Sequence, residues 1–319
     1  MAIRIRTWRG GAIEESRNVD DLARLVAIPE SRTWIDLSRP SPELLRAVTR
    51  RLGLHPLIAE EIGEQNQRAG VRLVGDAIHV VTFVLRRKAA LETEEVDFVL
   101  GRDYLLTVHG PGWDPESAHQ LRMGVGTVLA NGADYLFYAL ADAIVDGYFP
   151  VIDRIGDEID DLQDLALAEP SPPTLQRIFA LKREMIRIRH VVAPTREVFA
   201  QLTSRAFGHI AERHVFYFRD VYDHLIRLDD ELDSYRELAA GALDVYLSSV
   251  NNNLSTIMKR LTGVTVILAG IGAVAGLFGM SEATSALAGG EGAGFWIVVA
   301  AVVVAAILSV LVLRRINWL

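Results

Sequence analysis

The sequence predicts an α+β membrane protein, in which an N-terminal cytosolic α/β domain leads into a long-helix stalk and two C-terminal transmembrane helices. Three observations support this fold class. Two runs without a charged residue lie near the C-terminus, at 261–280 and 292–313, and each has the ~20 residues that a membrane-spanning helix needs. All eleven prolines lie at or before Pro194. Short β-branched segments alternate with turn residues before position 130. The expected divisions are therefore 1–130 for the α/β domain, 131–258 for the stalk or funnel, and 259–319 for a transmembrane hairpin with an outer loop at 281–291.

The α/β domain is expected to contain short strands rich in β-branched and aromatic residues, each bounded by turn residues. The candidates are Ile3 to Trp8, Thr33 to Leu37, Val71 to Val74, Ala77 to Leu85, Glu95 to Leu100 and Tyr104 to His109. The last two are predicted to form a hairpin around Gly101-Arg102-Asp103. Ser41 followed by Pro42 predicts a helix start, because Ser is a favoured N-cap and Pro is tolerated at the first helical position. The order of the strands does not follow from the sequence.

The stalk is expected to begin with two helices joined by a tight turn. The first runs from about Asp134 to Leu167, and Pro150 predicts either a kink or a break near Gly147. The Pro-rich segment 169–173 turns the chain back, and the second helix follows from Thr174 to about Arg189. Opposite charges predict that these two helices pair. The acidic residues are Asp153, Asp157, Glu158, Asp160, Asp161 and Asp164, and the basic residues are Arg177, Lys182, Arg183, Arg187 and Arg189.

A third, much longer helix is expected from about Glu212 to Phe278. Neither a proline nor a cluster of turn residues interrupts this segment, so about 65 residues at ~1.5 Å each would make a rod of ~100 Å. The orientation of the spans follows from their basic flanks, since cytoplasmic loops carry the Lys and Arg excess. Lys259 and Arg260 precede the first span, Arg314 and Arg315 follow the second, and the loop between them has no basic residue. Both termini are therefore expected in the cytoplasm.

Composition and motifs exclude several classes of function. The chain has 33 Lys and Arg against 41 Asp and Glu, which argues against nucleic acid as a partner. The spacing of Gly270, Gly272 and Gly276 is not that of a dinucleotide-binding loop, and Gly272 to Gly276 is better interpreted as a GxxxG face, for helix packing in lipid or for lining a pore. The histidines suggest no zinc site, and no catalytic triad order or phosphate loop is present, so an enzyme is not expected.

Several motifs resemble those of the CorA family of pentameric divalent-cation channels. They are Asp134-Tyr-Leu-Phe-Tyr138, Asp142-Ala-Ile-Val-Asp146, Tyr217-Phe-Arg-Asp-Val-Tyr-Asp-His224, Leu243-Asp-Val-Tyr-Leu-Ser-Ser-Val250, Met258-Lys259, Gly279-Met280 and Trp318-Leu319. The resemblance covers nearly the whole chain. It implies a homopentamer in the cell (inner) membrane, with five long helices converging as a funnel and lining a central pore.

The resemblance also implies site residues. In the family the first span ends in Gly-Met-Asn, whereas this chain reads Gly279-Met280-Ser281, so Ser replaces the Asn that receives the hydrated ion. Glu282 and Glu291 are expected to make the outer mouth acidic. The pore-lining positions are Ser255, Met258, Leu261, Gly272 and Gly276, with ordinary helix packing as the alternative for Met258 and Leu261. Asp220 corresponds to a family carboxylate that binds a regulatory divalent ion between protomers, unless it is only a solvated charge. Its partner carboxylate is expected near Glu92 or Glu94.

These features predict a homopentameric channel or transporter for divalent metal ions, gated by cytosolic metal. Mg²⁺ is expected both as the transported and as the regulatory ion, with Co²⁺, Ni²⁺ or Zn²⁺ as alternative cargo and no organic cofactor. Membrane lipid and further copies of the chain are the other expected partners. The alternative is a non-conducting relative, a membrane scaffold or regulator that has lost ion selectivity together with the Asn.

Overall fold

The computed structural model of the protein describes residues 3–64, 68–88, 90–204, 207–278 and 293–315. These residues belong to two compact units. The first comprises residues 1–162 and 176–242, and the second comprises residues 163–175 and 243–319.

The first unit is built on a seven-stranded sheet with the strand order β2-β1-β3-β7-β6-β5-β4. Its strands are β1 (Ile3–Arg9), β2 (Ala12–Ser16), β3 (Arg32–Ser38), β4 (Gly70–Val74), β5 (Ala77–Arg87), β6 (Leu91–Leu100) and β7 (Tyr104–His109). Neighbouring strands pair antiparallel, except β3 and β7, which pair in parallel. The predicted strands and the β6–β7 hairpin are confirmed. A Cβ on Gly101 in its turn would lie 2.2 Å from the ring of Tyr104, so this position requires glycine.

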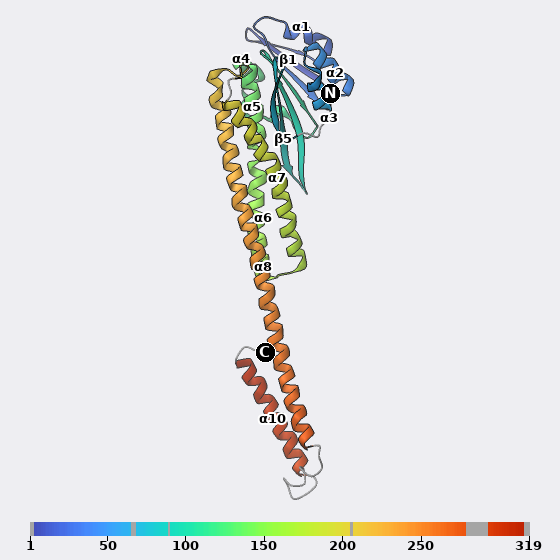
Figure 1. The fold of residues 1–319 in the computed structure, drawn as a ribbon, viewed down its shortest axis with the longest axis vertical. Coiled ribbons are helices and arrows are strands. Elements are labelled where there is room, and N and C mark those ends of the chain that lie inside the picture. The colour runs from blue at the N-terminus through green and yellow to red at the C-terminus, as the bar shows by residue number, and fades with distance from the viewer. Residues whose placement is uncertain (1–2, 65–67, 89, 205–206, 279–292, 316–319) are drawn as a thin grey trace. The chain divides into compact units, whose positions relative to one another are not determined.

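Helices cover both faces of this sheet (Figure 1). One face packs against α1 (Leu22–Val26), α2 (Pro42–Arg51) and α3 (Pro56–Glu64) through a core that includes Ile35, Leu45 and Leu106. The other face packs against α4 (Val125–Asn131) and α5 (Ala133–Asp146), where the rings of Phe98 and Phe137 are 5.1 Å apart. Inward-facing residues alternate along each strand, so both faces can be apolar. The predicted start of α2 is confirmed, because the Ser41 hydroxyl accepts a hydrogen bond from the Leu44 amide at 3.2 Å.

Three further helices follow α5 along the chain: α6 (Phe149–Ala168), α7 (Pro172–Ser204) and α8 (Val215–Phe278). The helix expected from Asp134 to Leu167 is broken at Gly147 and Tyr148, where α5 ends and α6 begins. The buried Tyr148 hydroxyl donates a hydrogen bond to the Phe83 carbonyl on β5, which fixes the break against the sheet. The long helix expected near Glu212 is confirmed, with a 3₁₀ turn at Glu212–His214 before it.

Helix α7 does not end near Arg189, as the sequence predicted, but continues through Pro194 to Ser204. A proline in a helix removes one N–H and strains the preceding turn. Here the Thr195 hydroxyl donates to the Val191 carbonyl at 2.8 Å, and Phe199 beyond it is fully buried. Tertiary packing therefore stabilises α7 beyond Pro194, although proline usually ends a helix.

The predicted pairing of an acidic α6 with a basic α7 is largely wrong. Among the described residues, the ion pair that joins these two helices directly is Arg177 to Glu158 at 3.7 Å. A bridge through the sheet is tighter, because Arg87 on β5 binds both Glu158 and Glu184. Most of the remaining basic charge of α7 faces α8 or solvent, and Arg189 binds Asp233 of α8 at 2.5 Å.

The second unit contains the C-terminal part of α8 and the helix α10 (Ala293–Arg315). An open cavity of about 550 Å³ between these helices is lined by Ile267, Gly270, Ile271 and Val274 of α8 and by Val302, Ala305 and Ser309 of α10. Two stretches of the described chain are long and apolar enough to cross a membrane. The stretch Ala133–Ala168 has 67% of its apolar window buried and is a core helix segment, whereas Glu212–Gly276 has only 6% buried.

Candidate metal centre

Helices α5 and α8 of the first unit bring three metal-binding side chains together. Asp142 lies on α5, while Asp220 and His224 lie four residues apart on α8 and therefore share one face of that helix. One ligand atom from each residue lies within 4.8 Å of the other two. Asp142 is buried, His224 is half-buried and Asp220 is exposed, so an ion can approach from the Asp220 side.

Two atoms of this centre lack hydrogen-bond partners within the described residues, although both are buried: Asp142 Oδ1 and His224 Nδ1. The other Asp142 oxygen is held by Gln120, whose Nε2 donates to Oδ2 at 2.6 Å. Buried polar atoms are almost always satisfied, and an unsatisfied one often indicates an ion or a catalytic role. His224 Nδ1 lies 3.8 Å from the Asp146 carboxylate, beyond hydrogen-bond distance. Both atoms therefore have the character of unused metal ligands.

The charges of the centre repel one another. Burial raises the pKa of Asp142 to about 6, and the neighbouring carboxylates of Asp146 and Asp220 add to the rise. The amide of Gln120 and the imidazole of His224 lower it only in part. Burial also raises the pKa of Asp146, one turn further along α5. A divalent cation would relieve this repulsion, because opposite charge favours the ionised form of a carboxyl group.

Aromatic side chains hold α5 against α8 beside these residues. The rings of Tyr138 and Tyr217 are 4.9 Å apart, and those of Phe137 and Phe218 are 5.4 Å apart. The Phe149 ring meets His224 edge to face at 5.8 Å. These contacts limit how far the ligands on the two helices can separate, which a metal site needs if it is to be formed before the ion arrives.

Two carboxylates and one imidazole admit several divalent cations. Mg²⁺ prefers oxygen ligands and keeps several waters, so one or two carboxylates suffice to hold it. Imidazole suits Zn²⁺, Co²⁺ and Ni²⁺ better. The residues therefore fit a hydrated Mg²⁺ through Asp142 and Asp220, and a softer metal through His224 as well.

The sequence identified Asp220 but not its two neighbours in this centre. Asp142 and His224 were noticed only as parts of motifs. Asp142 lies 78 or more residues before the other two residues along the chain, so the sequence gave no reason to group it with them. The suggested partners Glu92 and Glu94 lie elsewhere in the chain and bind Arg86 at 3.7 and 3.1 Å. The four-residue spacing of Asp220 and His224 was the available signal.

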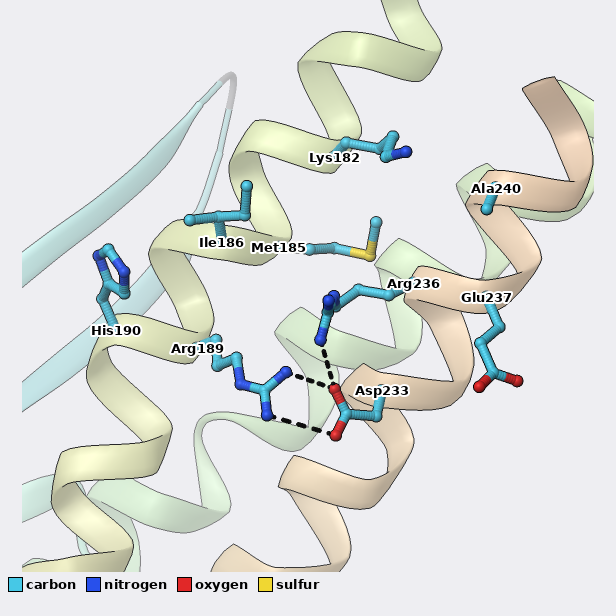
Figure 2. Close-up of a pocket in the computed structure, with 9 residues that line it drawn as sticks. All are labelled: Lys182, Met185, Ile186, Arg189, His190, Asp233, Arg236, Glu237 and Ala240. Carbon is cyan, nitrogen blue, oxygen red and sulfur yellow. Dashed lines mark hydrogen bonds and ion pairs between the residues drawn. The ribbon is translucent and has the colours of Figure 1, made fainter.

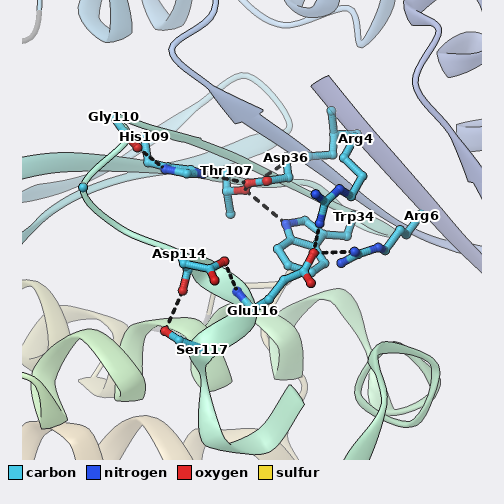
Figure 3. Close-up of polar contacts among 12 residues, drawn as sticks. Arg4, Arg6, Trp34, Asp36, Thr107, His109, Gly110, Asp114, Glu116 and Ser117 are labelled. Atoms are coloured by element: carbon cyan, nitrogen blue, oxygen red, sulfur yellow. Dashed lines mark hydrogen bonds and ion pairs between the residues drawn. The ribbon is translucent and has the colours of Figure 1, made fainter. Parts of the chain in front are cut away.

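Another buried histidine illustrates the structural role that was expected for this residue type. His109 at the end of β7 donates from Nδ1 to the Gly110 carbonyl at 2.5 Å, and its Nε2 lies 3.2 Å from Asp36 (Figure 3). Burial alone lowers the pKa of His109, but contact with the Asp36 carboxylate outweighs burial and raises it. The same carboxylate accepts from the Thr107 hydroxyl at 2.6 Å, so this group fixes the strands rather than binding a metal.

The predicted pore residues all lie on α8 and are uncovered within the chain. Met258 and Leu261 are 61% and 60% exposed, and Ser255 is exposed as well. A Cβ on Gly272 or Gly276 would meet nothing within 4 Å, so the GxxxG face makes no helix contact among the described residues of the chain. Met258, Leu261, Gly272 and Gly276 differ in helical phase from the residues that face α10. Gly279, Met280, Ser281, Glu282 and Glu291 lie outside the described residues.

The fold and the centre define a class of protein: an α/β domain whose last helix carries a candidate divalent-cation site and continues into an uncovered apolar segment. Comparison with known proteins then specifies the family. The model of the CorA-like Mg²⁺ transporter proteins matches residues 30–315. The chain therefore belongs to the CorA-like Mg²⁺ transporter family.

Individual relatives agree with this assignment. The chain is 34% identical over 281 residues to the cobalt/magnesium transport protein CorA of Thermotoga maritima, covering 85% of this chain and 80% of that one. It is 26% identical over 258 residues to the zinc transport protein ZntB of Cronobacter sakazakii, covering 78% and 76%. The structure of the CorA magnesium transporter of Methanocaldococcus jannaschii superposes with a TM-score of 0.82 at 22% identity, covering 100% of this chain and 99% of that chain. This last likeness concerns the fold.

Proposed function

We propose that the chain is a membrane transporter for divalent metal cations, with Mg²⁺ as its main cargo and Co²⁺, Ni²⁺ or Zn²⁺ as alternatives. The observation that carries the proposal is the Asp142, Asp220 and His224 centre. Two of its ligands lie on α8, the helix that continues unbroken to Phe278. Family membership and relatives named for magnesium, cobalt and zinc transport support the same function.

In this proposal the centre senses cytosolic metal. Residues 1–130 form the cytosolic α/β domain, residues 131–258 form the stalk, and residues 259–319 form the membrane hairpin, with both termini in the cytoplasm. The ion path runs along the axis of a homopentamer and is lined by Ser255, Met258, Leu261, Gly272 and Gly276. The bare GxxxG face and the exposure of Leu261 support this arrangement, since a small-residue face allows close helix approach in lipid. Ser281 and the acidic Glu282 and Glu291 receive the ion outside.

Metal at the centre would hold the path closed by linkage, because an ion that binds one state better shifts the protein toward that state. The test compares protease digestion of the purified chain with and without Mg²⁺ in the wild type and in Asp220→Asn. We expect Mg²⁺ to protect the stalk of the wild type and to protect the variant at least tenfold less. Equal protection of both chains would remove the sensing role of Asp220.

Transport itself is tested by ion flux into proteoliposomes, measured for each metal with and without a membrane potential. Passage of Mg²⁺ that rises with an inside-negative potential supports a channel. If neither the wild type nor Ser281→Asn passes any divalent ion, the chain is instead a non-conducting scaffold or regulator. That alternative is favoured by one observation, the replacement of the family Asn by Ser281.

A further inference from the structure

Helix α6 carries an acidic stripe that forms no ion pair with the described part of its own chain. Within the described residues Asp153, Asp157, Asp160 and Asp161 form no ion pair, and all four are exposed. Asp153, Asp157 and Asp161 follow one another at four-residue intervals, and Asp160 lies three residues after Asp157, so they lie along one side of the helix. The pairing with α7 that the sequence predicted therefore leaves this acidic stripe (Asp153, Asp157, Asp160 and Asp161) unused.

Helix α7 carries matching basic charge beside an open groove. The groove, of about 710 Å³, lies between α7 and α8 and is lined by Lys182, Met185, Ile186, Arg189, His190, Asp233, Arg236, Glu237 and Ala240 (Figure 2). Asp233 already binds Arg189 and Arg236 at 2.5 and 2.7 Å. Lys182 and the exposed Arg183 and Arg187 have no ion pair among the described residues. Of these three residues Lys182 lines the groove, whereas Arg183 and Arg187 lie beside it on α7, and Arg187 lines a neighbouring pocket. We call this groove together with the flanking Arg183 and Arg187 the basic groove.

The floor of the basic groove is apolar. Ile186, which lines the groove, is 51% exposed, and Phe179, three residues before Lys182 on the same helix, is 44% exposed. Exposed apolar side chains rimmed by charge are typical of protein interaction surfaces. The chemistry of the groove thus suits an acidic, helical partner.

The acidic stripe and the basic groove border α8 on different sides. A Cβ on Gly156 of α6 would lie 2.6 Å from the Tyr235 hydroxyl, so α6 packs against the Tyr235 side of α8. The groove lies on the Asp233 side. Two residues advance about 200° around a helix of 3.6 residues per turn, so the two sides are roughly opposite. One copy of the chain therefore presents opposite charges on its two flanks.

We propose that the acidic stripe of one copy docks in the basic groove of the next copy. This contact is heterologous, and a heterologous contact closes into a ring when its rotation allows. Opposite charges then fix which flank meets which and exclude a back-to-back dimer, because like charges would face each other. The inference rests on the proposed homo-oligomer and specifies which surfaces hold it together.

Zero-length crosslinking tests the contact directly, since the chain has lysines only at positions 88, 182 and 259. A carbodiimide joins a carboxylate to a lysine amine that touches it. We expect dimer and larger bands on a denaturing gel to contain a peptide that links Lys182 to the acidic stripe. Lys182→Arg keeps the charge and should remove this linked peptide. Intact assembly whose larger bands lack the link would overturn the inference and leave the proposed function standing.

A charge exchange provides the second measurement. Arg183→Glu with Arg187→Glu should weaken assembly at least tenfold in low salt, measured by native mass spectrometry in mild detergent, and adding Asp157→Lys with Asp161→Lys should restore it. Arg46→Glu with Arg50→Glu, two exposed positions on α2, is the matched control and should change nothing. Failure of the exchange to restore assembly would also overturn the inference. A wild-type chain that is monomeric throughout would instead remove the proposed homo-oligomer itself.

Discussion

Protons should compete with metal at the centre formed by Asp142, Asp220 and His224. The pKa of Asp142 is raised to about 6, so its carboxyl group gains a proton over a range in which ordinary aspartates stay ionised. The folded chain binds this proton more tightly than the unfolded chain, and ionisation therefore lowers the stability of the metal-free protein as the pH rises from about 4 to about 6. A bound cation requires the ionised form and would reverse this penalty.

The expected change in Mg²⁺ affinity with pH follows from the pKa of Asp142. With a pKa of about 6, roughly nine tenths of Asp142 is ionised at pH 7 and roughly one tenth at pH 5. The apparent affinity for Mg²⁺ should thus fall about tenfold between these pH values. Asp142→Asn removes the ionisable group and keeps the partner of Gln120. It should raise the unfolding free energy of the metal-free protein by about 1–3 kcal/mol at pH 7 while abolishing most of the stabilisation by Mg²⁺.

Thermal unfolding with increasing Mg²⁺ at pH 5, 6 and 7 measures both effects. Asp146 lies beside the same centre, 3.8 Å from His224, so Asp146→Asn is the matched control. It should retain most of the pH dependence, because Asp146 is not one of the three side chains whose ligand atoms lie within 4.8 Å of one another. A wild-type affinity for Mg²⁺ that is equal at pH 5 and pH 7, or an Asp142→Asn variant that still responds to Mg²⁺ like the wild type, would refute the reasoning.

Four further outcomes are expected. Arg87→Met should lower the unfolding free energy by about 3–5 kcal/mol in chemical denaturation, because Glu184 is left buried without its cation. The control is Arg24→Met, which breaks the exposed pair of Arg24 with Glu14. An equal loss of stability in the control would contradict this prediction. Leu261→Ser should raise metal flux at high internal metal if an apolar ring closes the path, and unchanged flux would place the gate elsewhere. Ser281→Asn should raise the selectivity for Mg²⁺ by restoring an amide. Neutralising Glu282 and Glu291 together should lower the metal flux most at low ionic strength. A loss of flux that does not depend on salt would exclude attraction by charge.

Most elements of the fold follow from local patterns in the sequence. The one missed strand, β2, has almost no buried side chain, so it lacks the alternation that marks a half-buried strand. It exists because β1 offers hydrogen bonds along its edge. The strand order was unreadable for a related reason, since the parallel pair of β3 and β7 joins segments far apart in the chain, and no local signal predicts such a crossover.

The candidate metal centre also depends on contacts between segments that are far apart in the sequence. Asp220 was found through its motif, but Asp142 lies beside it only because α5 packs against α8 through Tyr138 and Tyr217. Tertiary packing also decided the length of α7, where the fully buried Phe199 outweighs the helix-breaking tendency of Pro194. Charge pattern misled in the opposite way, because complementary α6 and α7 surfaces on one chain were assumed to meet within that chain.

The electrostatics of Asp142 have a mechanical consequence. If the proposed centre binds a cation, its release would leave the carboxylates at positions 142, 146 and 220 to repel one another, and movement of α8 away from α5 would relieve part of this repulsion without proton uptake. A bound cation would hold these carboxylates close together, and its release would let their repulsion push on α8, the helix that carries Asp220. The direction of that push is set by the line from Asp142 to Asp220, so the side chains that resist it are the aromatic pairs beside the centre. The more firmly these aromatic pairs hold α5 and α8 together, the less the helices would move. More of the electrostatic repulsion would then remain as a raised pKa of Asp142.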